Sequence, residues 1–133
     1  EGERLLIPSI GMHEAIYQGR RGELNKGAWL RPQTSTPDKG SNTVIVGHRF
    51  TYTDDNAVFY HLDKISSGDI IAVYWGGKEY NYRTREVKVV PATAVEIEAP
   101  TENNQLTLYT CTPLWSAKDR LVIIAEEIYR EHP

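Results

Sequence analysis

Cysteine is almost absent from this sequence of 133 residues, which contains only Cys111. A single cysteine excludes an internal disulfide framework and any zinc site built mainly from thiolates. The four histidines show neither His-x-His nor His-x-x-x-His spacing, and no cluster of acids has the calcium-binding pattern, so we expect no metal site. The one thiol therefore needs another explanation.

Long apolar runs are also missing. No window approaches the run of about 18 apolar residues that a membrane-spanning helix needs, and residues 1–6 lack the apolar core of a signal peptide. Because the chain begins with Glu1 and not with Met, we expect a soluble fragment whose membrane anchor lies outside it. Acids and bases are interspersed and sum to a formal net charge of -3, which argues against a nucleic-acid partner. Without repeats or low-complexity tracts, residues 1–133 are expected to form one domain.

Most of the chain has the pattern of β-strands. Short runs rich in Val, Ile, Tyr and Thr alternate with Gly, Pro, Asn and Asp. The clearest predicted strands are Asn42–Gly47, Asp69–Trp75, Lys78–Val90, Gln105–Cys111 and Arg120–Ile128, with weaker ones at Arg4–Ile7 and Glu14–Tyr17. The pattern predicts a mostly β fold, in which seven or eight strands would close a barrel.

Local patterns between these strands predict a hairpin, a bulge and a helix. The Gly76-Gly77 pair is typical of a tight hairpin turn. The apolar face of the following strand moves by one residue between Thr84 and Val87, which predicts a bulge near Arg85. Residues 57–65 have apolar side chains at helical spacing and acidic or amide caps before them, which predicts one short helix.

Cys111 and Arg120 are predicted to lie opposite each other. Only the eight residues Thr112–Asp119 separate the two strands, whereas a parallel crossover needs about a dozen, so the strands should be antiparallel neighbours. A guanidinium beside a thiol lowers the thiol pKa and stabilises developing negative charge. The pair therefore resembles a nucleophile with its electrostatic partner. Sixty-two residues separate His48 from Cys111, and spacing alone does not connect the two.

Three stretches resemble the sortase family, and the resemblance covers nearly the whole chain. Thr107-Leu108-Tyr109-Thr110-Cys111 is similar to the family's Thr-Leu-x-Thr-Cys signature, and Arg120-Leu121-Val122 is similar to its Arg-Leu-Val. The stretch from Asn42 to Arg49 looks like the strand that delivers the family's histidine. The resemblance implies a closed eight-stranded sortase-like β-barrel with one or two short helices, in which the strands before His48 and Cys111 are parallel neighbours.

The resemblance also implies a cysteine transpeptidase without a cofactor. Such an enzyme cleaves a Leu-Pro-x-Thr-Gly-like sorting signal of a surface protein or pilin between Thr and Gly, through a thioester. It then transfers the protein to an amine acceptor, a peptidoglycan precursor or a lysine. The implied location is the extracellular face of the cell membrane of a Gram-positive-type bacterium, with membrane contact only through the missing anchor. Whether the enzyme anchors proteins or polymerises pilins stays open.

The resemblance assigns roles to five residues. Cys111 would be the nucleophile, His48 the general acid and base, and Arg120 the group that positions substrate and stabilises the oxyanion. The Thr110 hydroxyl would add a donor, and Trp115 would wall the peptide groove. Gly47, just before the histidine, is expected to let the chain turn sharply.

Two alternatives stay open. An L,D-transpeptidase that cross-links peptidoglycan also uses Cys, His and Arg on a β fold, but it would need a Ser-x-Gly-Cys-x-Arg type stretch, which is absent around Cys111. A non-catalytic β-barrel binding module would keep Cys111 as a buried apolar residue.

Overall fold

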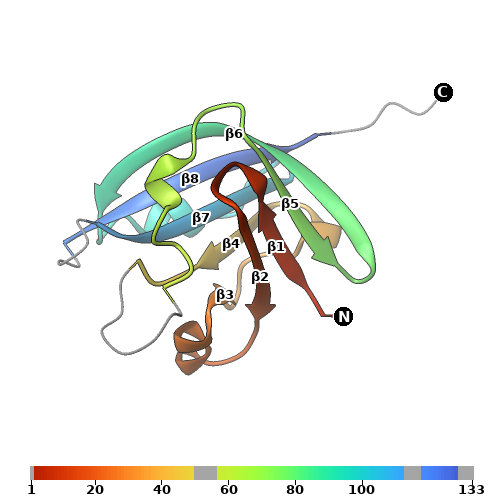
Figure 1. The fold of residues 1–133 in the computed structure, drawn as a ribbon, viewed down its shortest axis with the longest axis horizontal. Coiled ribbons are helices and arrows are strands. Elements are labelled where there is room, and N and C mark those ends of the chain that lie inside the picture. Colours follow the sequence, from red (N-terminus) through yellow and green to blue (C-terminus); the bar gives the residue numbers. More distant parts are fainter. Residues whose placement is uncertain (1, 50–56, 113–117, 129–133) are drawn as a thin grey trace.

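The chain forms a closed barrel of eight strands in a computed structural model (Figure 1). The structure describes residues 2–49, 57–112 and 118–128, with the backbone alone at 111 and 112. Around the barrel the strands follow the order β1-β2-β3-β4-β7-β8-β6-β5. Their bounds are β1 Arg4–Ile7, β2 Met12–Tyr17, β3 Ala28–Leu30, β4 Asn42–Val46, β5 Ile70–Trp75, β6 Lys78–Pro91, β7 Gln105–Thr112 and β8 Asp119–Glu127.

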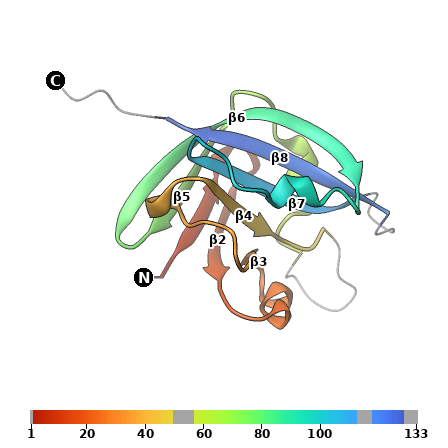
Figure 2. The same ribbon diagram turned by 180° about the vertical axis from the view of Figure 1, so that it is seen from behind.

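Five short 3-10 helices connect the strands in the described part of the chain. They are η1 Pro8–Ile10, η2 Arg21–Lys26, η3 Pro37–Lys39, η4 Leu62–Lys64 and η5 Val95–Glu98. Figure 2 shows η2 and η5 on the outside of the barrel, η2 beside β3 and η5 over β7. These two elements frame the outer surface of β4 and β7.

The strand pairing confirms the predicted topology. β4 and β7 are parallel, with Val46 opposite Tyr109. β7 and β8 are antiparallel, and Cys111 is the direct partner of Arg120. The ends of β4, β7 and the beginning of β8 therefore meet at one edge of the barrel, although they are far apart in the sequence.

The barrel interior holds one large apolar cluster. Alternate residues of β7 point into it, so that Leu106 and Leu108 are fully buried beside Ile45 and Ile123. A second, smaller cluster lies outside the sheet and is made by Leu24, Trp29, Val44 and Val46, with Tyr109 packed against it. This outer cluster anchors η2 to the outer face of β4.

The predicted hairpin and bulge are confirmed. Gly76 and Gly77 both have positive φ angles, 58° and 80°, as a primed two-residue turn requires. The pairing of β6 with β8 shifts between Thr84 and Glu86. β3 was not predicted, because its three residues are all buried and show no alternation.

Of the predicted helix over residues 57–65, only the last part is helical, as the 3-10 helix η4. The segment forms consecutive turns that end in η4, with the amide of Ile65 donating to the Leu62 carbonyl (3.2 Å). The Phe59 amide donates outside the segment, to the carbonyl of His48 (3.1 Å). The Phe59 amide and the apolar side chains that suggested a helix thus make tertiary contacts instead of forming a regular helix. The predicted caps at residues 54–56 lie outside the described residues.

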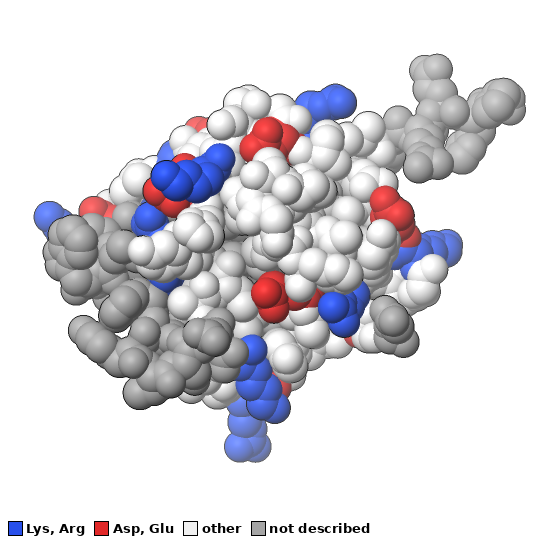
Figure 3. Space-filling model, in the orientation of Figure 1, with Lys and Arg blue, Asp and Glu red and all other residues white. Residues whose placement is uncertain are grey.

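Acidic and basic side chains are interspersed on the face shown in Figure 3, around a centre that is mainly uncharged. This matches the mixed charge pattern of the sequence. Within the described residues, the structure contains no helix with the length and apolarity needed to cross a membrane.

Candidate functional site

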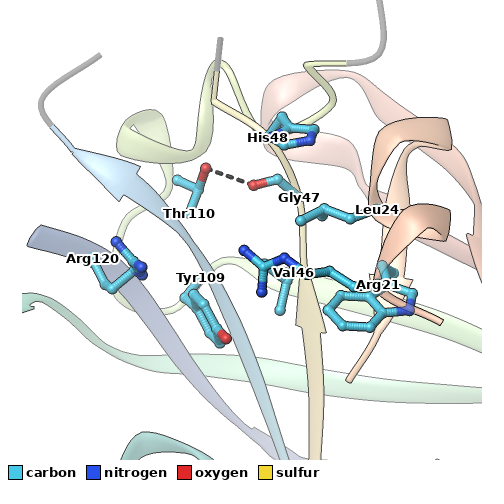
Figure 4. A pocket seen from close by; sticks show the side chains of 9 residues that line it. Arg21, Leu24, Val46, Gly47, His48, Tyr109, Thr110 and Arg120 are labelled. Carbon is cyan, nitrogen blue, oxygen red and sulfur yellow. Dashed lines mark hydrogen bonds between the residues drawn. The ribbon is translucent and has the colours of Figure 1, made fainter. Parts of the chain in front are cut away.

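The candidate site lies where β4 and β7 end side by side. Beyond the last paired residues, the Gly47 amide donates to the carbonyl of Tyr109 (3.3 Å). The buried Thr110 hydroxyl donates to the Gly47 carbonyl (2.7 Å) (Figure 4). Two hydrogen bonds therefore fix the backbone just before His48 against the residues that precede Cys111.

Gly47 is needed for close packing and not for a sharp turn, which corrects the expectation from the sequence. Its φ angle is not among the positive ones. A Cβ atom at this position would lie 2.8 Å from Cδ2 of Phe59 and 2.9 Å from Cγ2 of Val58. Val58 and Phe59 therefore lie directly against Gly47, and only glycine leaves room for them.

His48 receives a partner from η2. Its Nε2 lies 2.9 Å from Oδ1 of Asn25, so the ring donates through Nε2–H to the amide oxygen. Its backbone carbonyl accepts from Phe59. The histidine is thus contacted from both sides of the β4 end, by η2 and by the segment that leads to η4.

Arg120, Thr110 and His48 line one pocket. Arg120 is partly exposed, and one of its guanidinium nitrogens donates to the Asp119 carbonyl (3.3 Å). For Cys111 the register alone is described, and it places this residue directly opposite Arg120. Trp115 lies outside the described residues. The pocket is lined by Arg21, Leu24, Trp29, Val46, Gly47, His48, Tyr109, Thr110 and Arg120 (Figure 4).

A polar network supports the far wall of this pocket. The Tyr109 hydroxyl donates to Glu98 of η5 (2.6 Å), and Nε of Arg31 donates to the same carboxylate (3.1 Å). The Arg31 guanidinium lies 5.5 Å from the ring centre of Trp29, whose indole donates to the Gly19 carbonyl (3.1 Å). Burial, together with the hydrogen bond to Glu98, raises the pKa of Tyr109 well above its usual value. Tyr109 therefore stays a neutral donor.

Sequence reasoning missed four residues of this site. Tyr109 stands two positions before Cys111 on one strand, and this period-two spacing was a signal that would have found it. Arg21, Asn25 and Glu98 carry no such signal, because connecting segments without periodicity bring them to the site. Among the described residues, no group of three His, Cys, Asp or Glu side chains could hold a metal ion.

Comparisons with known proteins agree with this architecture. Residues 5–128 match the family model described as the sortase domain. Sortase A of Listeria monocytogenes is 25% identical over 123 residues, which are 92% of this chain and 54% of that protein. The chain thus spans about half the length of this curated relative.

Solved sortase structures superpose on nearly the whole chain. The sortase C1 of GBS pilus island 1 has a TM-score of 0.87 and 27% identity, covering 98% of this chain and 66% of that one. The sortase D5 transpeptidase of Clostridium perfringens has a TM-score of 0.84 and 26% identity, covering 96% of this chain and 78% of that one. Since the family model also matches almost every residue, this chain belongs to the sortase family.

Proposed function

We propose that residues 1–133 form the catalytic domain of a cysteine transpeptidase that cleaves a Leu-Pro-x-Thr-Gly-like sorting signal between Thr and Gly. The observation that carries the proposal is the direct pairing of Cys111 with Arg120, at the edge where β4 delivers His48. A cation beside a cysteine favours its thiolate, which is the nucleophilic form. The same cation suits the oxyanion of a tetrahedral intermediate.

The proposed reaction has two balanced steps. The Cys111 thiolate attacks the threonine carbonyl carbon, the C–N bond to glycine breaks, and His48 gives a proton to the leaving amine. An acceptor amine then attacks the thioester, gives its proton to His48, and releases the Cys111 thiolate. His48 returns to its starting state because each cycle donates and recovers one proton.

The composition of the pocket supports a peptide substrate. One side of the pocket is apolar, which suits the Leu and Pro of a sorting signal, and it is formed by Leu24, Trp29, Val46 and Tyr109. Arg120 and His48 form a basic side. The role of Thr110 is mainly to hold the backbone before His48 in place, because its hydroxyl donates to the Gly47 carbonyl. We retain Trp115 as a wall of the groove.

The protein substrate is proposed to be a surface protein or a pilin, and the acceptor amine a peptidoglycan precursor or a lysine. The relatives support either choice, because one is a sortase of a pilus island and another a sortase A. The proposed location is the extracellular face of a Gram-positive-type cell membrane, where such substrates are displayed.

Mass spectrometry of the protein after incubation with Leu-Pro-x-Thr-Gly peptides tests the proposal. We expect a thioester adduct on Cys111 that disappears when glycine oligomers or lysine are added. Cys111→Ala should abolish cleavage and leave the fold intact. Arg120→Ala should slow the reaction about 100- to 1,000-fold, and Arg120→Lys should restore little of it, since the bidentate fork is lost.

Undiminished cleavage by Cys111→Ala would refute the assignment. A fully active Arg120→Lys variant would show that charge alone is required. Cross-linking of peptidoglycan stem peptides without cleavage of sorting peptides would instead favour an L,D-transpeptidase.

A further inference from the structure

The pocket contains a second arginine that the proposed chemistry does not use. Arg21 begins η2, and its side chain extends over β4 into the pocket, toward the side on which Tyr109 and Arg120 lie (Figure 4). Arg21 makes no hydrogen bond or ion pair with any residue that the structure describes. Its guanidinium is therefore available to a ligand.

The pocket offers Arg21 no carboxylate. None of its described lining residues is an acid. Two acids on the neighbouring elements already have partners: Glu23 of η2 pairs with Lys26 (3.1 Å), and Glu98 of η5 pairs with Arg31 (3.1 Å) and accepts from Tyr109. Two guanidinium groups and an imidazole thus line a pocket without an acidic lining residue. Such an arrangement attracts anionic groups.

We propose that Arg21 is a specificity-determining residue that binds a carboxylate of the substrate. The proposal rests on the transpeptidase function above. A guanidinium matches a carboxylate with two parallel hydrogen bonds, and this geometry selects an acid over its amide. The carboxylate belongs either to the x residue of the sorting signal or to the amine acceptor. The chemistry is the same in both cases, and matched ligand pairs separate them.

Two pairs of reactants differ only in the carboxylate. The peptide pair is Leu-Pro-Glu-Thr-Gly and Leu-Pro-Gln-Thr-Gly, with amidated ends, and the acceptor pair is diglycine and diglycine amide. The unmodified protein should prefer the acidic member of one pair by about three- to tenfold in kcat/KM. Arg21→Gln should bring that ratio close to one. A preference for the acidic peptide assigns the carboxylate to the signal, and a preference for diglycine assigns it to the acceptor.

Arg20→Gln is the matched control. It removes the same charge one position earlier, from an exposed residue that does not line the pocket. Ratios that are the same in the unmodified protein and in Arg21→Gln would overturn the proposal. An equal loss in Arg20→Gln would also overturn it, because general surface charge would then explain the preference.

NMR titration of the Cys111→Ala variant with the same ligands measures their binding without turnover. It therefore tests whether Arg21 binds the carboxylate independently of the reaction. The acidic member of one pair should bind more tightly, and adding Arg21→Gln should remove the difference. If the unmodified protein cleaves neither peptide, the proposed function fails, yet the binding ratios still support or refute the role of Arg21. Raised salt should weaken the preference, since the guanidinium is exposed.

Discussion

The ring of His48 is oriented by a residue of η2. Asn25 accepts from Nε2 at 2.9 Å, which favours the tautomer that carries its proton on Nε2. In the proposed reaction this imidazole donates and recovers one proton per cycle, and a fixed orientation would assist both transfers. We therefore regard Asn25 as a positioning residue.

Asn25→Ala should lower kcat/KM about tenfold, because one hydrogen bond to the imidazole is lost. Asn25→Asp keeps an acceptor in place and should retain most of the activity. The ¹⁵N chemical shifts of the His48 ring report the tautomer, so they should change in the alanine variant and remain similar in the aspartate variant. A purely structural role for Asn25 would leave the ring shifts unchanged while the thermal stability fell.

At the scale of residues, the part of the site that follows strand register was predictable. The short loop before Arg120 was enough to place Arg120 opposite Cys111. Asn25 and Arg21 were not predictable, because a 3-10 helix brings Asn25 to His48 and Arg21 to the pocket, and the path of that helix depends on apolar packing outside the sheet. Such packing has no counterpart in local periodicity.

At the scale of elements, η5 is connected to β7 and to the loop after β3 through Glu98. The carboxylate accepts from Tyr109 and pairs with Arg31. The raised pKa of Tyr109 has a thermodynamic consequence. The unfolded chain releases the phenol proton near pH 10, whereas the folded protein keeps it, so the folded state binds more protons above that pH. The corresponding stabilisation is complete below pH 10 and is lost as the pH rises toward the folded-state value.

Tyr109→Phe should therefore cost about 1 to 2 kcal/mol of unfolding free energy between pH 7 and 9, through the lost hydrogen bond to Glu98. Above pH 10 the stability of the unmodified protein should fall faster than that of the variant, by up to about 1.4 kcal/mol per pH unit. Urea unfolding at several pH values measures the difference. Tyr60→Phe, at an exposed tyrosine, is the control. Parallel pH curves for the unmodified protein and Tyr109→Phe would contradict this interpretation.

Strands were easier to predict than the segments between them. Alternation identified β6 and its bulge, because residues two positions apart in a strand point to the same face of the sheet. β3 is too short and too deeply buried to alternate. The segment from 57 to 65 has helical spacing, but the contact of Phe59 with the residues around Gly47 decides its conformation. Long-range packing overrides local preference at both places.

At the scale of the molecule, a buried amide ties the β6–β7 connection to the barrel. Asn42 at the start of β4 is 2% exposed. Its Nδ2 donates to the carbonyls of Ile97 (3.0 Å) and Ala99 (2.9 Å), and its Oδ1 accepts from the Thr107 hydroxyl (2.7 Å). One side chain thus holds β4, β7 and the segment around η5 together.

Asn42→Ala should lower the unfolding free energy by about 1 to 3 kcal/mol, because the carbonyls of Ile97 and Ala99 and the buried Thr107 hydroxyl lose their partner. Denaturant unfolding measures the loss, and hydrogen exchange should show faster opening of the segment around η5. Asn103→Ala, at an exposed asparagine of the same connection, should change stability by less than about 0.5 kcal/mol. A similar effect of the two substitutions would indicate that the buried amide has no special role.

The position of β8 between β6 and β7 determines when this site can exist. A chain synthesised only as far as Thr112 already contains His48 and Cys111, but it lacks Arg120 and leaves β6 and β7 without their shared neighbour. Two long strand edges are then open, and such edges invite pairing with other chains. β8, which is made after β7, therefore completes the site and covers these edges in one step. Under the proposed function, a nascent chain would be inactive until its barrel can close.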